Sequence, residues 1–503
     1  MKQDIIINCT PQESRIAIVG DGSLHDFLIE RKAERGIVGN IYKAKVARVL
    51  PGMQAAFVDI GLDKAAFLHV SDFSTRPEDV SDLLTGSEEE FIFEGTKPSS
   101  HRRLPIERQL TRGQEILVQA AKDPMGTKGA RITSHVSLPG RYLVFMPNTN
   151  HIGISRRIEG DKERKRLRDI SQSLLTDKGG FILRTACEGR SKREVQRDLR
   201  FLIKLWQGIQ KKAKSATAPS IVHQDLDLIS RTIRDFFNTD TNQVVMDNVK
   251  EHRRIVDFVR HFMPRLKTKI TLYNQKAPIM DHYRVEEMVT KALDRNVWLP
   301  SGGYIIIERT EALTAIDVNT GRFVGKKNQE ETILKTNLEA TKEIVHQLRL
   351  RNAGGLIIID FIDMEKEANR KKVYEALKEA IKKDKARTNI LKISELGLVE
   401  MTRQRSRESL EHMLLSPCPY CEGRGRIKSH ITVAYELLRA IKRETMHLEE
   451  GKRIMVRLHP DIANFLYDEE THSLDLLERE INQKIAIKVS KELHHEQYEI
   501  SVV

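Results

Sequence analysis

Residues 302–321, GGYIIIERTEALTAIDVNTG, predict two strands joined by a turn. Apolar residues dominate 304–307 and 313–318, and the polar segment between them suits a turn. Asp317 and Asn319 lie two residues apart on the second strand, so their side chains share one face of an extended chain. The stretch therefore predicts a sheet that carries polar side chains near the end of a strand.

The following residues extend this hairpin into an α/β unit over 293–414. Residues 336–352, TNLEATKEIVHQLRLRN, have apolar side chains at helical spacing, and the glycine pair 354–355 ends the helix. Residues 356–360, LIIID, predict a short strand whose all-apolar run is typical of a strand covered on both faces. VYEALKEAIKK, at 373–383, predicts a second covering helix. We expect an α/β sandwich with acidic residues at its strand ends.

Two of those acidic residues are candidates for a metal site. Asp317 and Asp360 each follow a run of strand-forming residues. Carboxylates at neighbouring strand ends can hold a magnesium ion that keeps most of its waters, an arrangement that suits hydrolysis of a phosphodiester. Asn319 is placed to bond a carboxylate or the substrate, and Asp363 is a spare carboxylate nearby. Aspartates also cap strand ends without a metal, so the pattern alone leaves both interpretations open.

Residues 36–72 predict short strands of a small basic barrel, separated by glycine and proline turns. Phe57 and Phe67 fall on the polar parity of their strands, where they can stack on bases or close a barrel end. Residues 74–114 show no steady period and predict a long surface excursion. Lys122 and Lys128 flank the next turn and can hold a phosphate or simply face solvent.

A second basic region follows over 155–214, interrupted by a short strand that ends in Arg184 and Thr185. An arginine beside a hydroxyl at a strand end can hold a phosphate through charge-assisted hydrogen bonds. A surface salt bridge is the alternative interpretation of the same residues.

The stretch 418–426, CPYCEGRGR, contains Cys418 and Cys421 on a tight turn and supplies two of the four ligands of a structural zinc ion. His412 and His430 could complete the site within one chain. A second copy of the chain could instead supply the same two cysteines, because a two-fold axis through the metal doubles the ligand number. Cys9 and Cys187 lie in apolar contexts and are expected to be buried.

The composition is that of a globular protein whose positive charge favours a polyanionic partner. The chain has 503 residues with a net charge of +13, which favours nucleic acid as a partner. Four cysteines make no disulfide framework, and no apolar run approaches the length of a membrane span. The first residues lack a secretion signal, so we expect a cytoplasmic protein. Residues 429–503 predict a small α/β unit with a helix at 432–444 and strands at 453–459 and 484–490.

The motifs GIVGNIYKAKVARVLPGMQAAFVDIGLDKAAFLHVSD, LPSGGYIIIERTEALTAIDVNTG, QLRLRNAGGLIIIDFIDM and CPYCEGRGR, in this order, resemble those of the ribonuclease E and ribonuclease G family. The resemblance spans nearly the whole chain. It is greater to the ribonuclease G members, because the chain ends soon after the small C-terminal unit. The implied fold is an α/β multidomain chain with these parts: an RNase H-like unit at 1–35 and 230–292, an inserted OB-fold barrel at 36–135 with its loop at 74–114, a 5′-phosphate sensor at 136–229, a DNase I-like catalytic unit at 293–414, a zinc-link at 415–428, and a small C-terminal oligomerisation domain at 429–503.

The resemblance also implies an activity: a magnesium-dependent endoribonuclease that cuts single-stranded A/U-rich RNA, is stimulated by a 5′-monophosphate, and acts on ribosomal RNA precursors and messenger RNA. It implies that Asp317 and Asp360 are magnesium ligands supported by Asn319, and that the RNA contacts are Phe57, Phe67 and Lys128, with Lys122 beside them. The implied 5′-phosphate pocket consists of Gly140, Val144, Arg156, Arg184 and Thr185. Cys418 and Cys421 are the implied zinc ligands, shared between two protomers of a homodimer or tetramer. A non-catalytic RNA-binding protein and a DNA phosphodiesterase are the alternatives.

Overall fold

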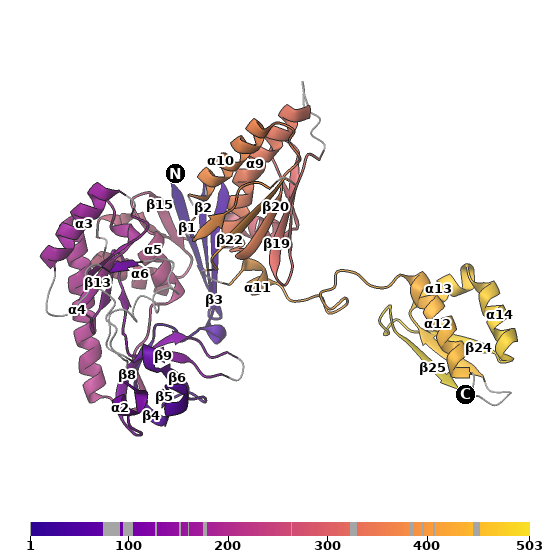
Figure 1. The fold of residues 1–503 in the computed structure, drawn as a ribbon, viewed down its shortest axis with the longest axis horizontal. Coiled ribbons are helices and arrows are strands. Elements are labelled where there is room, and N and C mark those ends of the chain that lie inside the picture. Colours follow the sequence, from indigo (N-terminus) through magenta and orange to yellow (C-terminus); the bar gives the residue numbers. More distant parts are fainter. Residues whose placement is uncertain are drawn as a thin grey trace. The chain divides into compact units, whose positions relative to one another are not determined.

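The computed structural model describes residues 2–502, apart from 74–90, 94–103, 126–127, 150–151, 159, 175–178, 263, 322–328, 383, 385, 395–396, 406–407 and 446–452. The chain divides into two compact units, Met1–Met413 and Leu414–Val503 (Figure 1). Among the described helices, none combines the length and apolar character that a membrane crossing requires.

The first sheet of unit 1, here the β1 sheet, joins the N-terminus to a segment more than 200 residues later. Its strands, in spatial order, are β3 (Ser23–Arg31), β2 (Glu13–Gly20), β1 (Gln3–Cys9), β15 (Thr241–Met246) and β16 (Ile270–Leu272). The first three are antiparallel, whereas β15 and β16 run parallel to β1. The associated helices are α5 (Leu228–Phe236), α6 (Val249–Phe262), α7 (Ile279–His282) and α8 (Val285–Leu293).

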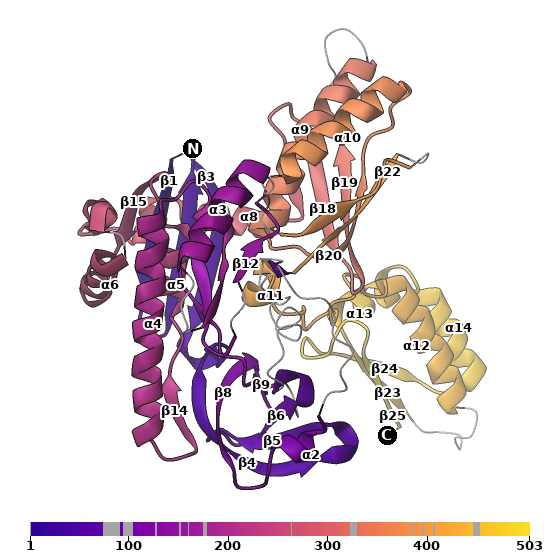
Figure 2. The ribbon, with the colours of Figure 1, turned by 60° about the vertical axis from the view of Figure 1, so that its left-hand side comes forward.

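A closed barrel of five strands is inserted between β3 and β15 (Figure 2). The ring consists of β4 (Ile41–Leu50), β5 (Ala55–Asp59), β6 (Ala66–His69), β9 (Arg131–Thr133) and β8 (Glu115–Lys122), and β8 closes it by pairing with β4. Ala44, Val46, Val58 and Leu68 share one parity of their strands and fill the interior. Small apolar side chains on one parity therefore suit the narrow core of this barrel.

The next sheet, here the β13 sheet, packs against two helices. Its strand order is β10 (Leu138–Pro139), β11 (Leu143–Met146), β13 (Gly180–Leu183), β12 (Ile152–Ser155) and β7 (Phe91–Phe93). The helices α3 (Asp161–Leu174) and α4 (Lys192–Ser215) contribute Leu167 and Trp206 to its core. Ser191 and Glu194 form a capping box that fixes the start of α4.

The barrel and the β13 sheet exchange strands. β7 lies within the excursion expected at 74–114 but pairs with β12, while β14 (Ser220–His223) follows α4 but pairs with β4. The excursion also contains the short helix α2 (Ile106–Gln109), whose Ile106 is in the barrel core with Leu110. The prediction of a surface excursion was therefore wrong for these parts, and the rest of it lies outside the described residues.

The fourth sheet, here the β19 sheet, contains the hairpin that opened the sequence. Its strand order is β17 (Asn296–Trp298), β18 (Tyr304–Arg309), β19 (Leu313–Asn319), β20 (Gly355–Asp360), β22 (Leu398–Arg403) and β21 (Thr388–Ile390). Two long helices, α9 (Gln329–Leu350) and α10 (Glu367–Ile381), lie side by side along it (Figure 1), and α11 (Leu410–Leu414) follows.

The prediction that both faces of this sheet are covered was wrong. Ile357 and Ile359 of β20 are fully buried in the core beneath α9 and α10, whereas Leu356 is 41% exposed and Asp360 is exposed. An all-apolar run does not reveal which face is open, because Leu356 and Ile358 look like core residues in the sequence. The helices cover one face, and the other carries the candidate carboxylates.

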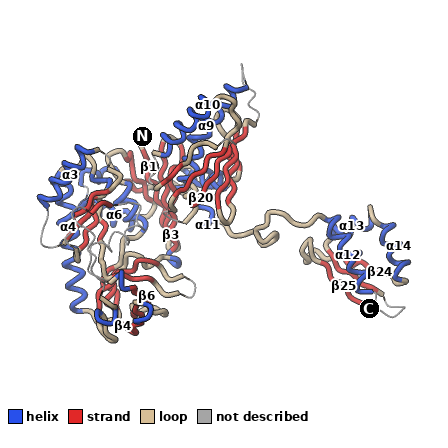
Figure 3. Tube along the Cα trace, viewed as in Figure 1, coloured by secondary structure: helices blue, strands red, loops and turns tan. Residues whose placement is uncertain are grey.

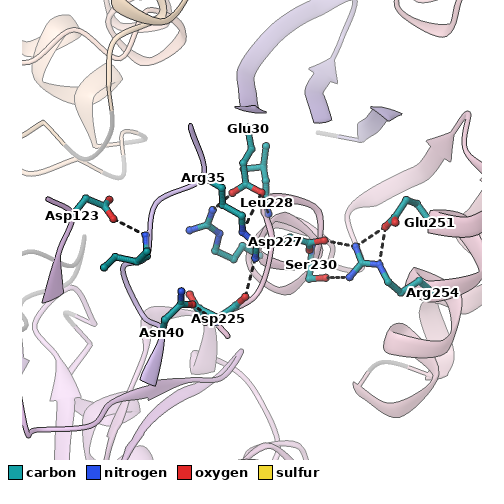
Figure 4. A network of polar contacts seen from close by, with 12 residues as sticks. Glu30, Arg35, Asn40, Asp123, Asp225, Asp227, Leu228, Ser230, Glu251 and Arg254 are labelled. Carbon is teal, nitrogen blue, oxygen red and sulfur yellow. Dashed lines mark hydrogen bonds and ion pairs between the residues drawn. The ribbon is translucent and has the colours of Figure 1, made fainter. Parts of the chain in front are cut away.

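A network of polar contacts joins the β1 sheet to the entrance of the barrel (Figure 4). Glu30, at the end of β3, accepts from the backbone N–H of Leu228 and pairs with Arg231 in α5. Asn40 accepts from the backbone N–H of Asp225 at 2.8 Å, and Asp123 accepts from Ile37 at 2.6 Å. A Cβ at Gly36 would lie 2.4 Å from the Asp123 carboxylate, so a side chain there would displace that carboxylate from its contact with Ile37.

Unit 2 has a three-stranded sheet with strand order β24 (Ile485–Val489), β23 (Ile454–Leu458) and β25 (Tyr498–Val502). It packs with α12 (His430–Thr445), α13 (Pro460–Asp468) and α14 (Thr471–Ile481) around one core. The sequence predicted α12, β23 and β24 but not the other elements. Residues 415–429, all of them described, contain neither helix nor strand (Figure 3).

Candidate functional site

The parallel pairing of β19 and β20 sets Asp317 directly opposite Asp360. Both carboxylates lie on the open face of the sheet, because the neighbouring residues Ile316, Val318 and Ile359 fill the core on the other side. Asn319 donates from Nδ2 to Oδ2 of Asp317 at 2.8 Å, one of the two interactions that the spacing allowed. The structure therefore brings these three predicted residues together.

The electrostatics of this face suit a cation. Partial burial, together with the negative charges of Asp317 and Asp363, raises the pKa of Asp360 above its ordinary value. Adjacent carboxylates hold their ionised forms at a free-energy cost, and a bound cation relieves that cost. Oxygen ligands of this kind match the preference of magnesium. The residues present thus fit the ion that the sequence suggested.

The barrel presents a row of cross-strand neighbours on its outer surface. Phe57 lies opposite Phe67, with ring centroids 6.2 Å apart in an edge-to-face arrangement. Arg48 pairs with Phe57 on one side, and Arg131 pairs with Phe67 on the other. Lys122 in turn pairs with Arg131. We call these five residues the basic-aromatic row.

The row combines stacking surfaces with positive charge. Phe57 is 37% exposed, and Phe67 is half-buried. Asp72, only 1% exposed, holds the Arg131 guanidinium through Oδ2 at 2.8 Å, and this hydrogen bond raises the pKa of Arg131. Lys128 is exposed on the turn between β8 and β9, where its backbone pairs with Met125. The arrangement is suited to a single strand, since unpaired bases can stack while phosphates meet cations.

Three residues of the predicted phosphate pocket lie where two neighbouring strands of the β13 sheet end. Arg156 follows β12 directly, and Arg184 and Thr185 follow β13, and because these strands are parallel their ends meet. Thr185 Oγ1 lies 3.1 Å from Oγ of Ser155. Arg184 donates from Nη1 to the carbonyl of Gly140 at 2.8 Å.

Val144 lies further along the sheet, opposite Ile182 and outside the main core cluster. At Gly140 a Cβ would lie 2.6 Å from Oδ2 of Asp198, so a side chain would displace the loop that meets Arg184.

Two carboxylates that sequence reasoning missed hold this edge together. Asp235 of α5 pairs with Arg184 at 2.8 Å and with Arg234 at 2.8 Å. Burial alone would raise the pKa of Asp235, but the hydrogen bonds and charges of the two arginines lower it to about 2. Asp198, 4% exposed, accepts the backbone N–H of Tyr142 at 2.7 Å. Their positions on amphipathic helices gave no signal, because both fit an ordinary helix pattern.

The cysteine turn is shaped to present thiolates. The backbone N–H groups of Cys421 and Tyr420, and the Cys421 side chain, lower the pKa of Cys418. Gly425 donates its N–H to Sγ of Cys421 at 3.3 Å, and Gly425 has a positive φ of 70° that suits glycine. Backbone donors that face both sulfur atoms on a tight turn suit a metal-bound cysteine pair and so fit a zinc ion.

The histidine alternatives for this site gain no support. His430 lies against Phe465 with ring centroids 5.1 Å apart. Among the described residues, no cluster of three or more metal-ligating side chains includes either cysteine of the turn. Cys187 is fully buried, as expected, and Cys9 is half-buried.

Comparison with known proteins now decides the family. The model of the ribonuclease E/G family matches residues 137–406, and that of the RNase E/G thioredoxin-like domain matches residues 417–503. The chain belongs to the ribonuclease E/G family. It is 45% identical to ribonuclease G of Haemophilus influenzae over 501 residues and 43% identical to ribonuclease G of Escherichia coli K12 over 500 residues, with 99% of each chain covered.

Ribonuclease E of Haemophilus influenzae is 38% identical over 488 residues, which are 96% of this chain and 50% of that relative. The greater similarity to the ribonuclease G relatives confirms the prediction made from the motifs.

The basic-aromatic row leads to a first prediction. Phe57→Ala should weaken binding of a short single-stranded RNA by about fivefold or more, since stacking contributes roughly 1–3 kcal/mol per base. Fluorescence anisotropy in EDTA would measure the affinity without cleavage. Phe201→Ala is the matched control, because Phe201 is 38% exposed but lies on α4. Equal effects of the two substitutions would show that Phe57 has no special contact with RNA.

Proposed function

We propose that this chain is a magnesium-dependent endoribonuclease that cuts single-stranded, A/U-rich RNA in the maturation of ribosomal RNA and the decay of messenger RNA. The in-register pair Asp317 and Asp360 on an open sheet face carries this proposal. Membership of the ribonuclease E/G family and the similarity to ribonucleases along the whole chain support it.

The chemistry follows from what the residues can do. Asp317 and Asp360 would hold the magnesium ion, and Asn319 restrains the Asp317 carboxylate through its amide. When bound, the ion would lower the pKa of an attacking water and neutralise charge on the scissile phosphate. Water attacks phosphorus, the P–O3′ bond breaks, and the downstream product keeps a 5′-phosphate. Asp363, close enough to influence Asp360, adds to the negative potential that attracts the cation.

The other parts of unit 1 would position the substrate. The basic-aromatic row stacks unpaired bases, which a duplex would not present. Arg156, Arg184 and Thr185 would bind a terminal 5′-monophosphate through charge-assisted hydrogen bonds, with Gly140 and Val144 shaping the pocket. Asp235 holds the Arg184 guanidinium in place, and its negative charge partly neutralises the positive charge of Arg184. Binding there would stimulate cleavage by keeping the RNA on the enzyme.

The family resemblance extends to the parts of the fold and to assembly. We infer that the β1 sheet is an RNase H-like unit, the barrel an OB fold and the β19 sheet a DNase I-like catalytic unit, with the boundaries given above. Cys418 and Cys421 would share one zinc ion with the same cysteines of a second copy, since the turn itself offers two thiolates. The chain would then form a homodimer or a tetramer of two dimers. We infer that it acts in the cytoplasm.

Removal of the carboxylates tests the catalytic proposal. Asp317→Asn or Asp360→Asn should lower cleavage of a 5′-monophosphorylated A/U-rich RNA by about 100-fold or more, the scale of losing one group that stabilises transition-state charge. RNA affinity should not fall. Glu311→Gln, a carboxylate at the other end of β19, is the control. Gel assays with and without magnesium measure cleavage, and binding without any cuts in the parent chain would favour a non-catalytic RNA-binding protein.

The phosphate pocket gives a separate prediction. Arg184→Ala should reduce the preference for 5′-monophosphorylated over 5′-hydroxyl RNA by about 10-fold, because a hydrogen bond to a charged group contributes roughly 1.5–3 kcal/mol. The rate on 5′-hydroxyl RNA should stay near that of the parent. Arg193→Ala, an exposed arginine on α4, should leave the preference intact. A loss of equal size on both substrates would contradict a sensor role.

The cysteine turn gives a third test. The double substitution Cys418→Ser and Cys421→Ser should convert the dimer to monomers and remove the shared zinc, whereas Cys9→Ser should change neither. Analytical ultracentrifugation and elemental analysis measure the two properties. A double variant that sediments as a dimer would rule out the shared zinc as the link.

A further inference from the structure

Unit 2 contains a cluster of metal-ligating side chains away from the cysteine turn. His459, Asp461 and His495 each offer a ligand atom, and these atoms all lie within 4.8 Å of one another. Nδ1 of His459 lies 3.5 Å from Oδ2 of Asp461, and Nδ1 of His495 lies 3.7 Å from the same oxygen. It is the single group of this kind that the described residues contain.

The sheet topology brings the three residues together from distant segments. β23 and β25 are antiparallel, and Leu458 at the end of β23 pairs with Tyr498 at the start of β25. His459 directly follows β23, so it emerges beside the segment that leads into β25, which contains His495. His459 also caps α13, where Nδ1 accepts the backbone N–H of Asp461 at 3.3 Å. This contact turns the start of α13, and with it Asp461, toward both imidazoles.

The geometry is close to that of a zinc site. Zinc–nitrogen bonds of about 2.0–2.1 Å in a tetrahedron place neighbouring ligand atoms about 3.3 Å apart. The two separations from Asp461, 3.5 and 3.7 Å, are close to this value, and all three ligand atoms lie within 4.8 Å of one another. Nδ1 of His459 accepts the backbone N–H of Asp461, so a metal bound at this nitrogen would replace that hydrogen bond. His495 is 9% exposed, whereas the Asp461 side chain is 62% exposed, which leaves one side open for a water ligand.

We propose that His459, Asp461 and His495 bind a divalent transition-metal ion, of which zinc is the best match, at a site separate from the cysteine turn. Two imidazoles and one carboxylate are borderline ligands that suit zinc, cobalt or nickel and disfavour magnesium. Without a metal, the same side chains make two histidine–carboxylate contacts, which are ionic only where the imidazole is protonated. The proposal stands on unit 2 alone and does not depend on the proposed RNA cleavage.

The residues on either side of His495 connect this site to the cysteine turn. His494 donates from Nε2 to the carbonyl of Tyr420 at 2.6 Å, and their rings lie 4.2 Å apart. Glu496 accepts the backbone N–H of Lys428 at 2.6 Å and pairs with Arg424 at 3.3 Å. A metal that fixes His495 therefore also fixes the two residues that hold the turn from both sides. The second site would stabilise the presentation of the cysteines to a partner.

Metal titration of the full-length Cys418→Ser Cys421→Ser chain tests the proposal, because the thiolates no longer compete. We expect one zinc per chain by isothermal titration calorimetry at pH 7.5, where imidazoles of ordinary pKa are neutral. Cobalt should give visible d–d absorption without a thiolate charge-transfer band. Adding Asp461→Asn or His495→Gln should lower the zinc affinity at least 10-fold, on the scale of losing a ligand contact.

His472→Gln, which changes an exposed histidine of α14, is the matched control and should leave binding unchanged. The same substitutions in the chain with intact cysteines provide a second measurement: Asp461→Asn should remove one zinc per chain by elemental analysis. Circular dichroism checks that each variant is folded. The site would be overturned if the folded Cys418→Ser Cys421→Ser chain showed no saturable zinc binding. Equal zinc binding after adding Asp461→Asn and after adding His472→Gln would overturn it as well.

Discussion

Two carboxylates held opposite each other on parallel strands are the constraint on which the structure depends. The register of β19 and β20 sets Asp317 opposite Asp360, and partial burial together with the nearby like charges raises the pKa of Asp360. This arrangement is maintained because the opposite face of the same strands is packed with isoleucine and valine beneath α9 and α10. Apolar burial on one face thus offsets electrostatic strain on the other.

Polar contacts connect the other sheets of unit 1 to one another. Glu30, Asn40 and Asp123 connect the β1 sheet to the barrel entrance (Figure 4). Asp235 connects α5 to Arg184 at the end of β13. Charge-assisted hydrogen bonds have strict directions, so they fix orientation as well as distance. The barrel and the candidate phosphate-binding residues are therefore held by elements far apart in the sequence.

The sequence predicted residues whose roles depend on local spacing. Strand parity placed Phe57 and Phe67 on the outer surface of the barrel, and the two-residue spacing placed Asn319 beside Asp317. It could not predict features that depend on tertiary packing. The sequence around Leu356 is apolar and gives no sign that this face of the sheet is open. Asp198 and Asp235 reach the candidate phosphate pocket only when α4 and α5 pack. His459 and His495 are likewise 36 residues apart, so strand pairing alone makes them neighbours.

The exchange of strands between the barrel and the β13 sheet has an evolutionary consequence. β7 lies within the chain segment of the barrel but pairs with β12 of the β13 sheet. β14 follows α4, which packs on the β13 sheet, but pairs with β4 of the barrel. Neither part can be excised or replaced without leaving an unpaired strand edge in the other. The two therefore form a single heritable module, and recombination that exchanged one of them alone would produce a chain prone to aggregate.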